Sequence, residues 1–123
     1  MDLSEAAARA RHDLGRYVAL QTRFVGVDGE EADLLAALES DLLHTRRSPG
    51  ATLGVAEVWA ACRGDLEPAG PALLAPVDAV VAALADRAAR LTTLDAVGLR
   101  ATAALALRCA EVVKELQRAL AGR

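Results

Sequence analysis

Apolar side chains recur at alternating four- and three-residue steps near the start of the chain. The stripe consists of Leu3, Ala7, Ala10, Leu14, Tyr17 and Phe24, with Val18 and Val25 beside it. A near-heptad period of this kind is typical of an amphipathic helix that packs against other helices. The pattern therefore predicts one helix from about Leu3 to Val25, with Gln21 as the one polar interruption of its apolar face.

A turn and a second amphipathic helix are predicted next. The turn is Val27-Asp28-Gly29, and Asp28 is expected to cap the helix because Glu31 follows three residues later, as in a capping box. The apolar face of this helix consists of Leu34, Leu35, Leu38 and Leu42. Ser48-Pro49-Gly50 should end the helix near Arg46 or Arg47, because proline interrupts helical hydrogen bonding.

The rest of the chain predicts three more helices. Thr52 is expected to cap a short helix that Gly64 stops, and a loop follows from Asp65 to Pro71. The clearest helix carries its apolar residues at three- and four-residue steps, at Leu74, Val77, Val81, Leu84, Ala88 and Leu91. A turn over 92–95 leads to a last helix, whose apolar face consists of Leu105, Cys109, Val112, Val113, Leu116 and Leu120.

The composition supports an all-α fold. Apolar residues make up 54% of the 123 residues and aromatic residues only 2%, so that Ala and Leu supply most of the apolar content. Both are strong helix formers. We therefore expect residues 1–123 to form a single antiparallel bundle of four to five helices. The scarcity of aromatic side chains argues against a base-stacking platform and against an aromatic-lined ligand pocket.

Charge and cysteine usage narrow the range of functions. The net charge is −3, whereas nucleic-acid-binding proteins typically carry an excess of basic residues. Cys62 and Cys109 form no CxxC pattern and stand at helical spacing from apolar residues, which favours a place in the core over a disulfide. The sequence shows no signal-peptide core and no apolar run that could span a bilayer. These features predict a soluble, cytoplasmic protein with no nucleic-acid or membrane partner.

The sequence offers no metal, cofactor or familiar catalytic motif. The histidines and cysteines show no standard zinc spacing, and neither His12 nor His44 stands in a Glu-x-x-His pair. Glycine-rich phosphate-binding loops and the Gly-x-Ser-x-Gly elbow are also missing. We therefore predict no metal and no cofactor, and we expect the protein not to be an enzyme unless it relays a phosphoryl group through a histidine.

His12 is the one chemical candidate. At about 100° per residue it lies roughly 160° from Leu14, and so it should face away from the apolar stripe. Arg9 and Arg16 are one turn before and one turn after it, and Arg23 shares the same outer face of the predicted helix. These three arginines could neutralise a phosphoryl group or attract an acidic partner, which makes them candidate binding residues.

The stretch Arg11-His12-Asp13-Leu14-Gly15-Arg16-Tyr17-Val18 resembles the histidine box of phosphorelay proteins. That family comprises the dimerisation and phosphotransfer helices of sensor kinases and the sporulation-type phosphotransferases. His12, Asp13 and Leu14 match its pattern of a histidine, an acid and a bulky apolar residue. Arg16 departs from it, because the family favours Asn or Thr there. The resemblance implies that His12 carries the phosphoryl group, that Asp13 assists as proton acceptor, and that the partner is a response-regulator receiver domain.

A second, shorter resemblance centres on His44. The segments His44-Thr45-Arg46-Arg47 and Ala51-Thr52-Leu53-Gly54 are similar to the small monomeric histidine-phosphotransfer bundles. In that family the helix continues through the histidine and beyond it, whereas here Pro49 and Gly50 should interrupt it.

Two functional hypotheses remain. The first is a small, non-catalytic helical module for interaction or regulation, either an adaptor or a self-associating bundle such as a homodimer. The charge segregation supports it, because the first predicted helix is rich in Arg while the segment Asp28–Asp41 has the acids expected of a solvated helical face. An exposed apolar patch would add support. The alternative is a histidine phosphotransfer protein of a bacterial phosphorelay, which requires an outward His12 that no salt bridge locks in place.

Overall fold

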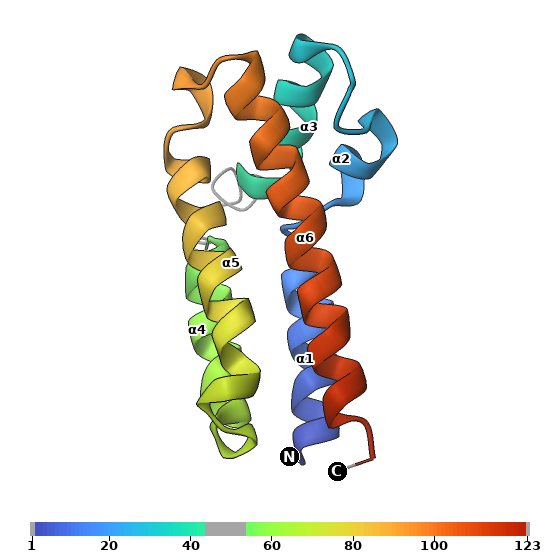
Figure 1. Cartoon of the computed structure of the whole chain (residues 1–123), viewed down its shortest axis with the longest axis vertical. Helices are drawn as coiled ribbons and strands as arrows, with labels where there is room; N and C mark the ends of the chain where they lie inside the picture. Colours follow the sequence, from blue (N-terminus) through green and yellow to red (C-terminus); the bar gives the residue numbers. More distant parts are fainter. Residues whose placement is uncertain (1, 44–53, 123) are drawn as a thin grey trace, which may run out of the picture.

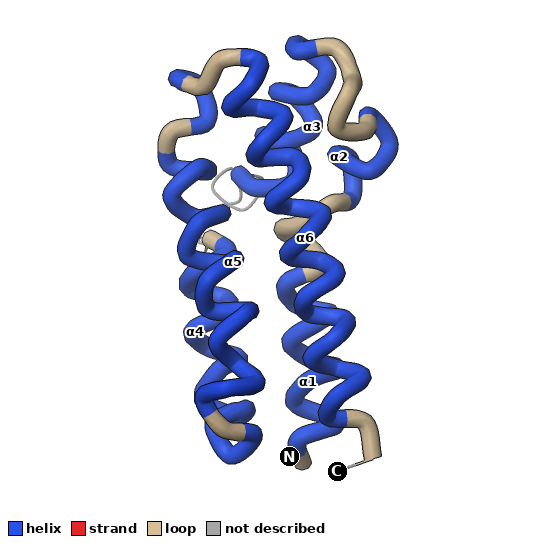
Figure 2. The backbone as a smooth tube through the Cα atoms, viewed as in Figure 1, coloured by secondary structure: helices blue, strands red, loops and turns tan. Residues whose placement is uncertain are grey.

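Six α-helices and two 3₁₀ turns make up the regular structure in the residues that the computed structural model describes, 2–43 and 54–122. The helices are α1 (Leu3–Leu14), α2 (Leu20–Val25), α3 (Glu31–Leu43), α4 (Val55–Leu66), α5 (Pro71–Ala89) and α6 (Ala96–Leu120). Figure 2 shows short loops between the helices of each described segment, and no strand occurs among the described residues. The predicted all-α bundle is confirmed.

Four helices form what we call the lower region: α1, α4, α5 and the C-terminal half of α6 (Figure 1). α1 packs against α4 and α6, and α5 packs against the same two helices, so that each helix has two neighbours. The chain runs upward in α1 and α5 and downward in α4 and α6. This alternation is the antiparallel packing that short connections favour.

The upper region consists of α2, α3 and the N-terminal half of α6, and it lies at the opposite end of the molecule from the labelled chain ends (Figure 1). α2 packs mainly on α3, and α3 packs on α6 and on the 3₁₀ turn Leu91–Thr93. In the sequence, α2 and α3 are therefore inserted between α1 and α4, the first and second helices of the lower region.

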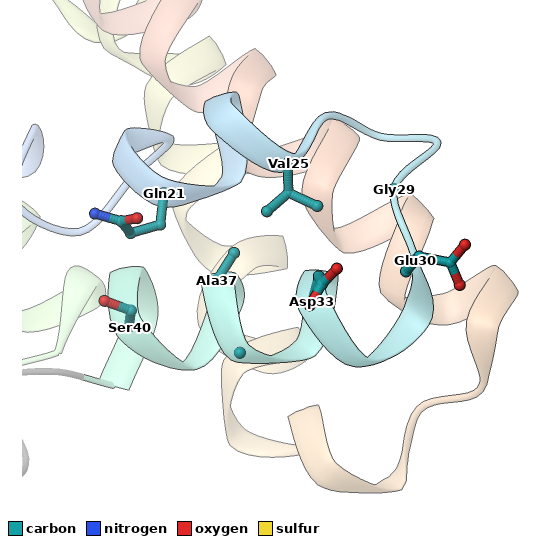
Figure 3. Close-up of a pocket in the computed structure, with 8 residues that line it drawn as sticks. Gln21, Val25, Gly29, Glu30, Asp33, Ala37 and Ser40 are labelled. Atoms are coloured by element: carbon teal, nitrogen blue, oxygen red, sulfur yellow. The ribbon is translucent and has the colours of Figure 1, made fainter.

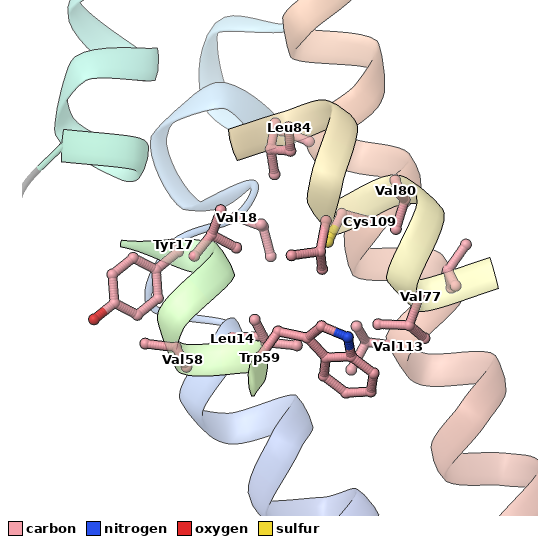
Figure 4. Packing of buried hydrophobic residues seen from close by; sticks show 14 of the residues in the cluster. Leu14, Tyr17, Val18, Val58, Trp59, Val77, Val80, Leu84, Cys109 and Val113 are labelled. Carbon is pink, nitrogen blue, oxygen red and sulfur yellow. The ribbon is translucent and has the colours of Figure 1, made fainter. Parts of the chain in front are cut away.

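The core is built from the predicted apolar stripes. Figure 4 shows Leu14, Trp59, Val77 and Val113, from four different helices, around a shared interior. The face predicted for α6 is buried except at Leu105, which is partly exposed. Both cysteines are buried and free, as expected of core residues. Burial raises the pKa of the Cys109 thiol to about 12, so this thiol stays protonated and serves as a small apolar group.

The prediction of one continuous helix over Leu3–Val25 is wrong. α1 ends at Leu14, the chain turns through residues 15–19, and α2 begins at Leu20. Ala19 has a φ of 68°, in the left-handed region that residues other than glycine rarely adopt. The turn also rotates the faces of the chain, and Phe24, predicted to be part of the apolar stripe, is 88% exposed.

A buried carboxylate from α3 explains why the chain turns here. Asp41 is 3% exposed, and its Oδ1 accepts a hydrogen bond from the Gln21 backbone N–H at 3.0 Å. Its Oδ2 accepts hydrogen bonds from the Thr22 N–H at 3.0 Å and from the Thr22 hydroxyl at 2.9 Å. The first N–H groups of a helix have no partner within it, and Ala19 provides no side-chain cap. Asp41 therefore caps α2 from another helix, and the prediction that this acid lies on a solvated face is wrong.

Three predicted element boundaries also shift. α4 continues past Gly64 to Leu66, because a glycine inside an exposed helix costs only about 1 kcal/mol. Most of the predicted loop over 65–71 is helical: α4 runs to Leu66 and a 3₁₀ turn follows over Glu67–Ala69. The break in helical structure comes at Gly70, where φ is 96°. The Leu34 N–H donates to the Glu30 carbonyl at 2.8 Å, so α3 begins two residues later than a cap at Asp28 predicts. The predicted helix end near Arg46 and the predicted cap at Thr52 lie outside the described residues.

Asp95 caps α6 in the predicted turn. Its Oδ1 accepts a hydrogen bond from the Gly98 N–H at 2.8 Å, which satisfies one of the free donors of the first helical turn. The turn over 92–95 thus connects α5 and α6 as antiparallel neighbours, as its length predicted.

Candidate functional site

His12 lies in the last turn of α1, and its side chain is 70% exposed. The outward orientation predicted from its angle to Leu14 is therefore observed. Its Nδ1 lies 3.2 Å from Oδ1 of the neighbouring Asp13. Leu14, two residues further on, is completely buried and anchors this end of the helix in the core. The imidazole is thus an accessible group on a firmly packed helix, with one ring nitrogen beside a carboxylate.

Asp13 joins three side chains from two helices. Its Oδ2 lies 3.6 Å from Nε of Arg9 and 3.9 Å from Sγ of Cys62, which belongs to α4. Burial raises the pKa of the Cys62 thiol, and the negative charge of Asp13 raises it further. Cys62 therefore stays a protonated thiol and is not a nucleophile. Asp13 is shared between His12, Arg9 and Cys62 rather than reserved for the histidine.

The three candidate binding arginines do not form one cluster. Arg9 approaches His12 through Asp13. Arg16 lies in the turn after α1, where it lines a shallow hollow of about 240 Å³, and Arg23 lies on α2. The prediction that all three share one helical face with His12 is wrong, because α1 ends before Arg16. His44, the second histidine candidate, lies outside the described residues.

The described residues offer neither a metal-binding cluster nor a membrane-spanning helix. Within residues 2–43 and 54–122, no group of three or more His, Cys, Asp or Glu side chains could hold a metal ion. None of the helices described is both long enough and apolar enough to cross a bilayer.

α2 presents two large apolar side chains to solvent. Leu20 is 59% exposed and Phe24 is 88% exposed. They are four residues apart, and at about 100° per residue they point away from Thr22, which is completely buried. We call Leu20 and Phe24 the α2 crest. The sequence reasoning missed it because Phe24 fits the apolar period of a continuous helix.

A cationic groove lies on one flank of the α2 crest. It has a volume of about 240 Å³ and runs between α2, the end of α1 and the C-terminal half of α6. Its walls include the buried Leu14, Val18 and Val113, so its floor is apolar. Its polar lining is supplied by Arg11, Arg23 and Lys114, and no described acidic residue lines it.

An acidic hollow lies on the other flank of α2, against α3 (Figure 3). This hollow is open and has a volume of about 400 Å³. Figure 3 shows Val25 on α2 opposite Asp33 on α3, and Gln21 further along α2, on the side of Ser40. Glu30 stands at the same end as Asp33, and no Lys or Arg among the described residues lines the hollow.

Comparisons with protein-family models, with curated proteins and with solved structures found no match. Two places on the molecule have chemistry that bears on its function: the α2 crest with its flanks, and the exposed His12.

Proposed function

We propose that the protein is a non-catalytic helical interaction module that binds a protein partner through the α2 crest. The observation that carries this proposal is the exposure of Phe24, 88%, beside Leu20, 59%, on one short helix. Burying a side chain of this kind contributes about 1.5–3 kcal/mol. Aromatic residues are enriched at interfaces, and Phe24 is the one phenylalanine in the chain.

The way α2 is held supports the proposal. Asp41 fixes the first turn of α2 through bonds to Gln21 and Thr22, so the crest has a defined position before any partner arrives. A preorganised surface loses less conformational entropy on binding than a loose one. The neighbouring cationic groove adds an apolar floor against which partner side chains could pack.

Site-specific photocrosslinking in the cells that make the protein tests the proposal. A photoreactive phenylalanine analogue replaces Phe24, and a matched control carries it at Val97, which is 73% exposed on α6. We expect a discrete adduct from position 24 that position 97 does not give, and its loss when Leu20→Ser is added. An adduct of two copies of the chain identifies a self-associating bundle, and an adduct with another protein identifies an adaptor. No specific adduct from position 24 would contradict the proposal.

The exposed His12 favours a second candidate function, phosphotransfer in a bacterial phosphorelay. Its Nδ1 lies 3.2 Å from Asp13 Oδ1, but this contact is to the adjacent residue and leaves the other side of the 70% exposed ring open, so it does not lock the imidazole away from a partner. Because Nδ1 faces Asp13, Nε2 is the ring nitrogen available to a receiver domain. Nε2 would attack the phosphorus of a receiver aspartyl phosphate, so that an N–P bond forms as the acyl O–P bond breaks and the aspartate regains its carboxylate. Asp13 would then accept the proton of the ring.

A phosphotransfer assay tests this second function. The protein is incubated with a panel of phosphorylated receiver domains, and acid-labile, alkali-stable phosphate on the chain is measured. We expect His12→Gln to abolish the label, His44→Gln to leave it, and Asp13→Asn to slow its appearance. Absence of label with every receiver would reject phosphotransfer and leave the interaction module as the remaining function.

A further inference from the structure

We propose that the partner segment crossing the α2 crest is dipolar: its carboxylates enter the cationic groove, its Lys or Arg side chains lie over the acidic hollow, and apolar residues between them cover Leu20 and Phe24. This inference rests on the proposed interaction function and specifies the chemistry of the partner. The observation behind it is that one six-residue helix separates two surfaces of opposite charge.

The geometry of α2 places both surfaces within reach of a single segment. At about 100° per residue, Arg23 projects from one side of the crest, whereas Gln21 and Val25 project from the other. Arg23 lines the groove, and Gln21 and Val25 line the hollow. A helix with its side chains is about 10–12 Å across, so a partner helix of two to three turns, roughly 11–16 Å long, spans α2 from flank to flank.

The positive charge of the groove is available to a partner. Arg23 makes no ion pair with any described residue. Arg11 donates to the neutral Gln117 amide oxygen at 2.7 Å, which leaves its charge uncompensated. Lys114 lies 3.5 Å from Glu111, and this exposed pair is a weak one. A carboxylate entering the groove would therefore meet two guanidinium groups whose charge no described acid neutralises, above an apolar floor.

The negative charge of the hollow is equally available. Neither Glu30 nor Asp33 makes an ion pair with a described residue, and both are exposed. The sequence from 28 to 43 holds six acids, namely Asp28, Glu30, Glu31, Asp33, Glu39 and Asp41, and no Lys or Arg. An acidic partner segment would be attracted by the groove but repelled by the hollow, and a basic segment the reverse. Only a segment with both signs of charge is attracted on both flanks.

Four synthetic peptides test the inference against the full chain by fluorescence anisotropy. All are amphipathic helices with the same apolar face and differ only at their polar positions. The dipolar peptide has Glu at one end and Lys at the other, and the other three have only Glu, only Lys or only Gln. We expect the dipolar peptide to bind most tightly, by ~2–5-fold for each matched charge at the rim. This preference should shrink as salt rises from 0.05 to 0.5 M, since exposed charges are screened.

Charge-reversal variants assign the preference to the two flanks. Glu30→Lys combined with Asp33→Lys should make the all-Glu peptide the tightest. Arg23→Glu combined with Arg11→Glu should favour the all-Lys peptide, because only the double reversal turns the lining of the groove net negative. Phe24→Ser should weaken all four peptides by a similar factor. Arg118→Glu, an exposed reversal in the last turn of α6, is the matched control and should change nothing. Circular dichroism confirms that each variant remains folded.

Three results would overturn the inference: no binding of the dipolar peptide, equal or tighter binding of a single-sign or neutral peptide, or a dipolar preference that survives both charge reversals. The crosslinking experiment separates this failure from failure of the proposed function. A specific adduct from position 24 together with any of the three results means that the module binds a partner of different chemistry. If position 24 gives no specific adduct, both the proposed interaction function and the dipolar-partner inference are rejected.

Discussion

The lower and upper regions are stabilised in different ways. In the lower region, each of the four helices buries an apolar stripe against two neighbours, so the interactions are spread over many side chains. In the upper region, α2 is only six residues long and Thr22 is its one buried residue. Apart from the partly buried Val25, which packs against the core, its first turn is held by the polar contacts of one carboxylate, Asp41.

Because of this difference, the residues that stabilise the fold are not the apolar residues that α2 exposes to solvent. Apolar packing that involves many residues resists local opening, whereas a short helix held by a few polar contacts can open without unfolding the rest. Because Asp41 holds the first turn of α2 and Val25 packs against the core, Leu20 and Phe24 are not needed inside the molecule. Leu20 and Phe24 can therefore remain at the surface, where the proposed interaction would use them.

The largest expected effect is loss of packing in the lower region. Leu74 on α5 is 1% exposed, and Leu74→Ala should lower the free energy of unfolding by about 2–5 kcal/mol through lost burial and a new cavity. Urea denaturation followed by circular dichroism measures it. The matched control is Leu20→Ala, which should change stability by at most ~0.5 kcal/mol because the side chain is exposed. An equal loss of unfolding free energy in the two variants would contradict the proposed difference between the lower region and α2.

The next largest effect should be local to α2. Asp41→Ala leaves the buried N–H and hydroxyl of Thr22 without their acceptor, at a cost of about 1–3 kcal/mol. Hydrogen exchange should lose protection at residues 20–25 while protection in α5 persists. Asp33→Ala removes an exposed acid from the same helix, α3, and should leave α2 protected. If Asp41→Ala lowers protection uniformly, the two regions are one cooperative unit.

A pair of glycine substitutions compares the two backbones. Ala8→Gly, at an exposed position inside α1, should destabilise by about 1 kcal/mol. Ala19→Gly should be neutral or stabilising, by up to ~1 kcal/mol, because glycine adopts the left-handed conformation that Ala19 occupies at φ 68°. Thermal denaturation distinguishes them. Equal destabilisation would mean that the turn between α1 and α2 carries no strain.

The smallest effect concerns the polar contacts at the surface of the lower region. Asp78 on α5 accepts hydrogen bonds from Trp59 Nε1 at 2.7 Å and from Arg63 Nε at 2.9 Å. The Arg63 contact holds the pKa of the Asp78 carboxyl below its usual range. A lowered folded-state pKa contributes stability above the unfolded pKa, near 4, and that stability is lost as pH falls through the folded value.

Asp78→Asn tests this pH dependence. At pH 7 the variant should be less stable than the wild type by at most ~1 kcal/mol, because the carboxylate is 37% exposed. The difference should shrink as pH falls below the unfolded pKa and through the lowered folded pKa, because the wild-type carboxyl then becomes protonated as well. A difference that stays constant from pH 7 to pH 2 would exclude the Asp78 charge as its source.

The apolar period predicted the lower region well because its helices follow strict three- and four-residue steps. In α5, the stripe from Leu74 to Ala88 is buried at each predicted position. The same period failed at Phe24, because a turn of five residues interrupts the helix without interrupting the spacing of apolar residues. The local signals of that turn were weak: Gly15 alone marks the end of α1, and Ala19 gives no hint of a left-handed backbone.

The function of Asp41 depends on a contact between helices, which the spacing of residues along one helix does not show. A signal was nevertheless present. Asp41 stands three residues after Leu38 and seven after Leu34, within the apolar face of its own helix. A carboxylate at such a position needs hydrogen-bond donors from a neighbouring element. The candidate site divides in the same way: the exposure of His12 followed from helical geometry, whereas the α2 crest required the tertiary fold.

The position of the only tryptophan makes the two regions optically distinguishable. Trp59 is buried in the lower region and bonded to Asp78, so its emission follows the environment between α4 and α5. Opening of α2 would leave that environment intact and would be silent in intrinsic fluorescence. Fluorescence and hydrogen exchange of α2 should then give separate transitions in Asp41→Ala but a common one in Leu74→Ala. The chain thus carries a natural spectroscopic probe for the packing of α4 against α5, separate from the opening of α2.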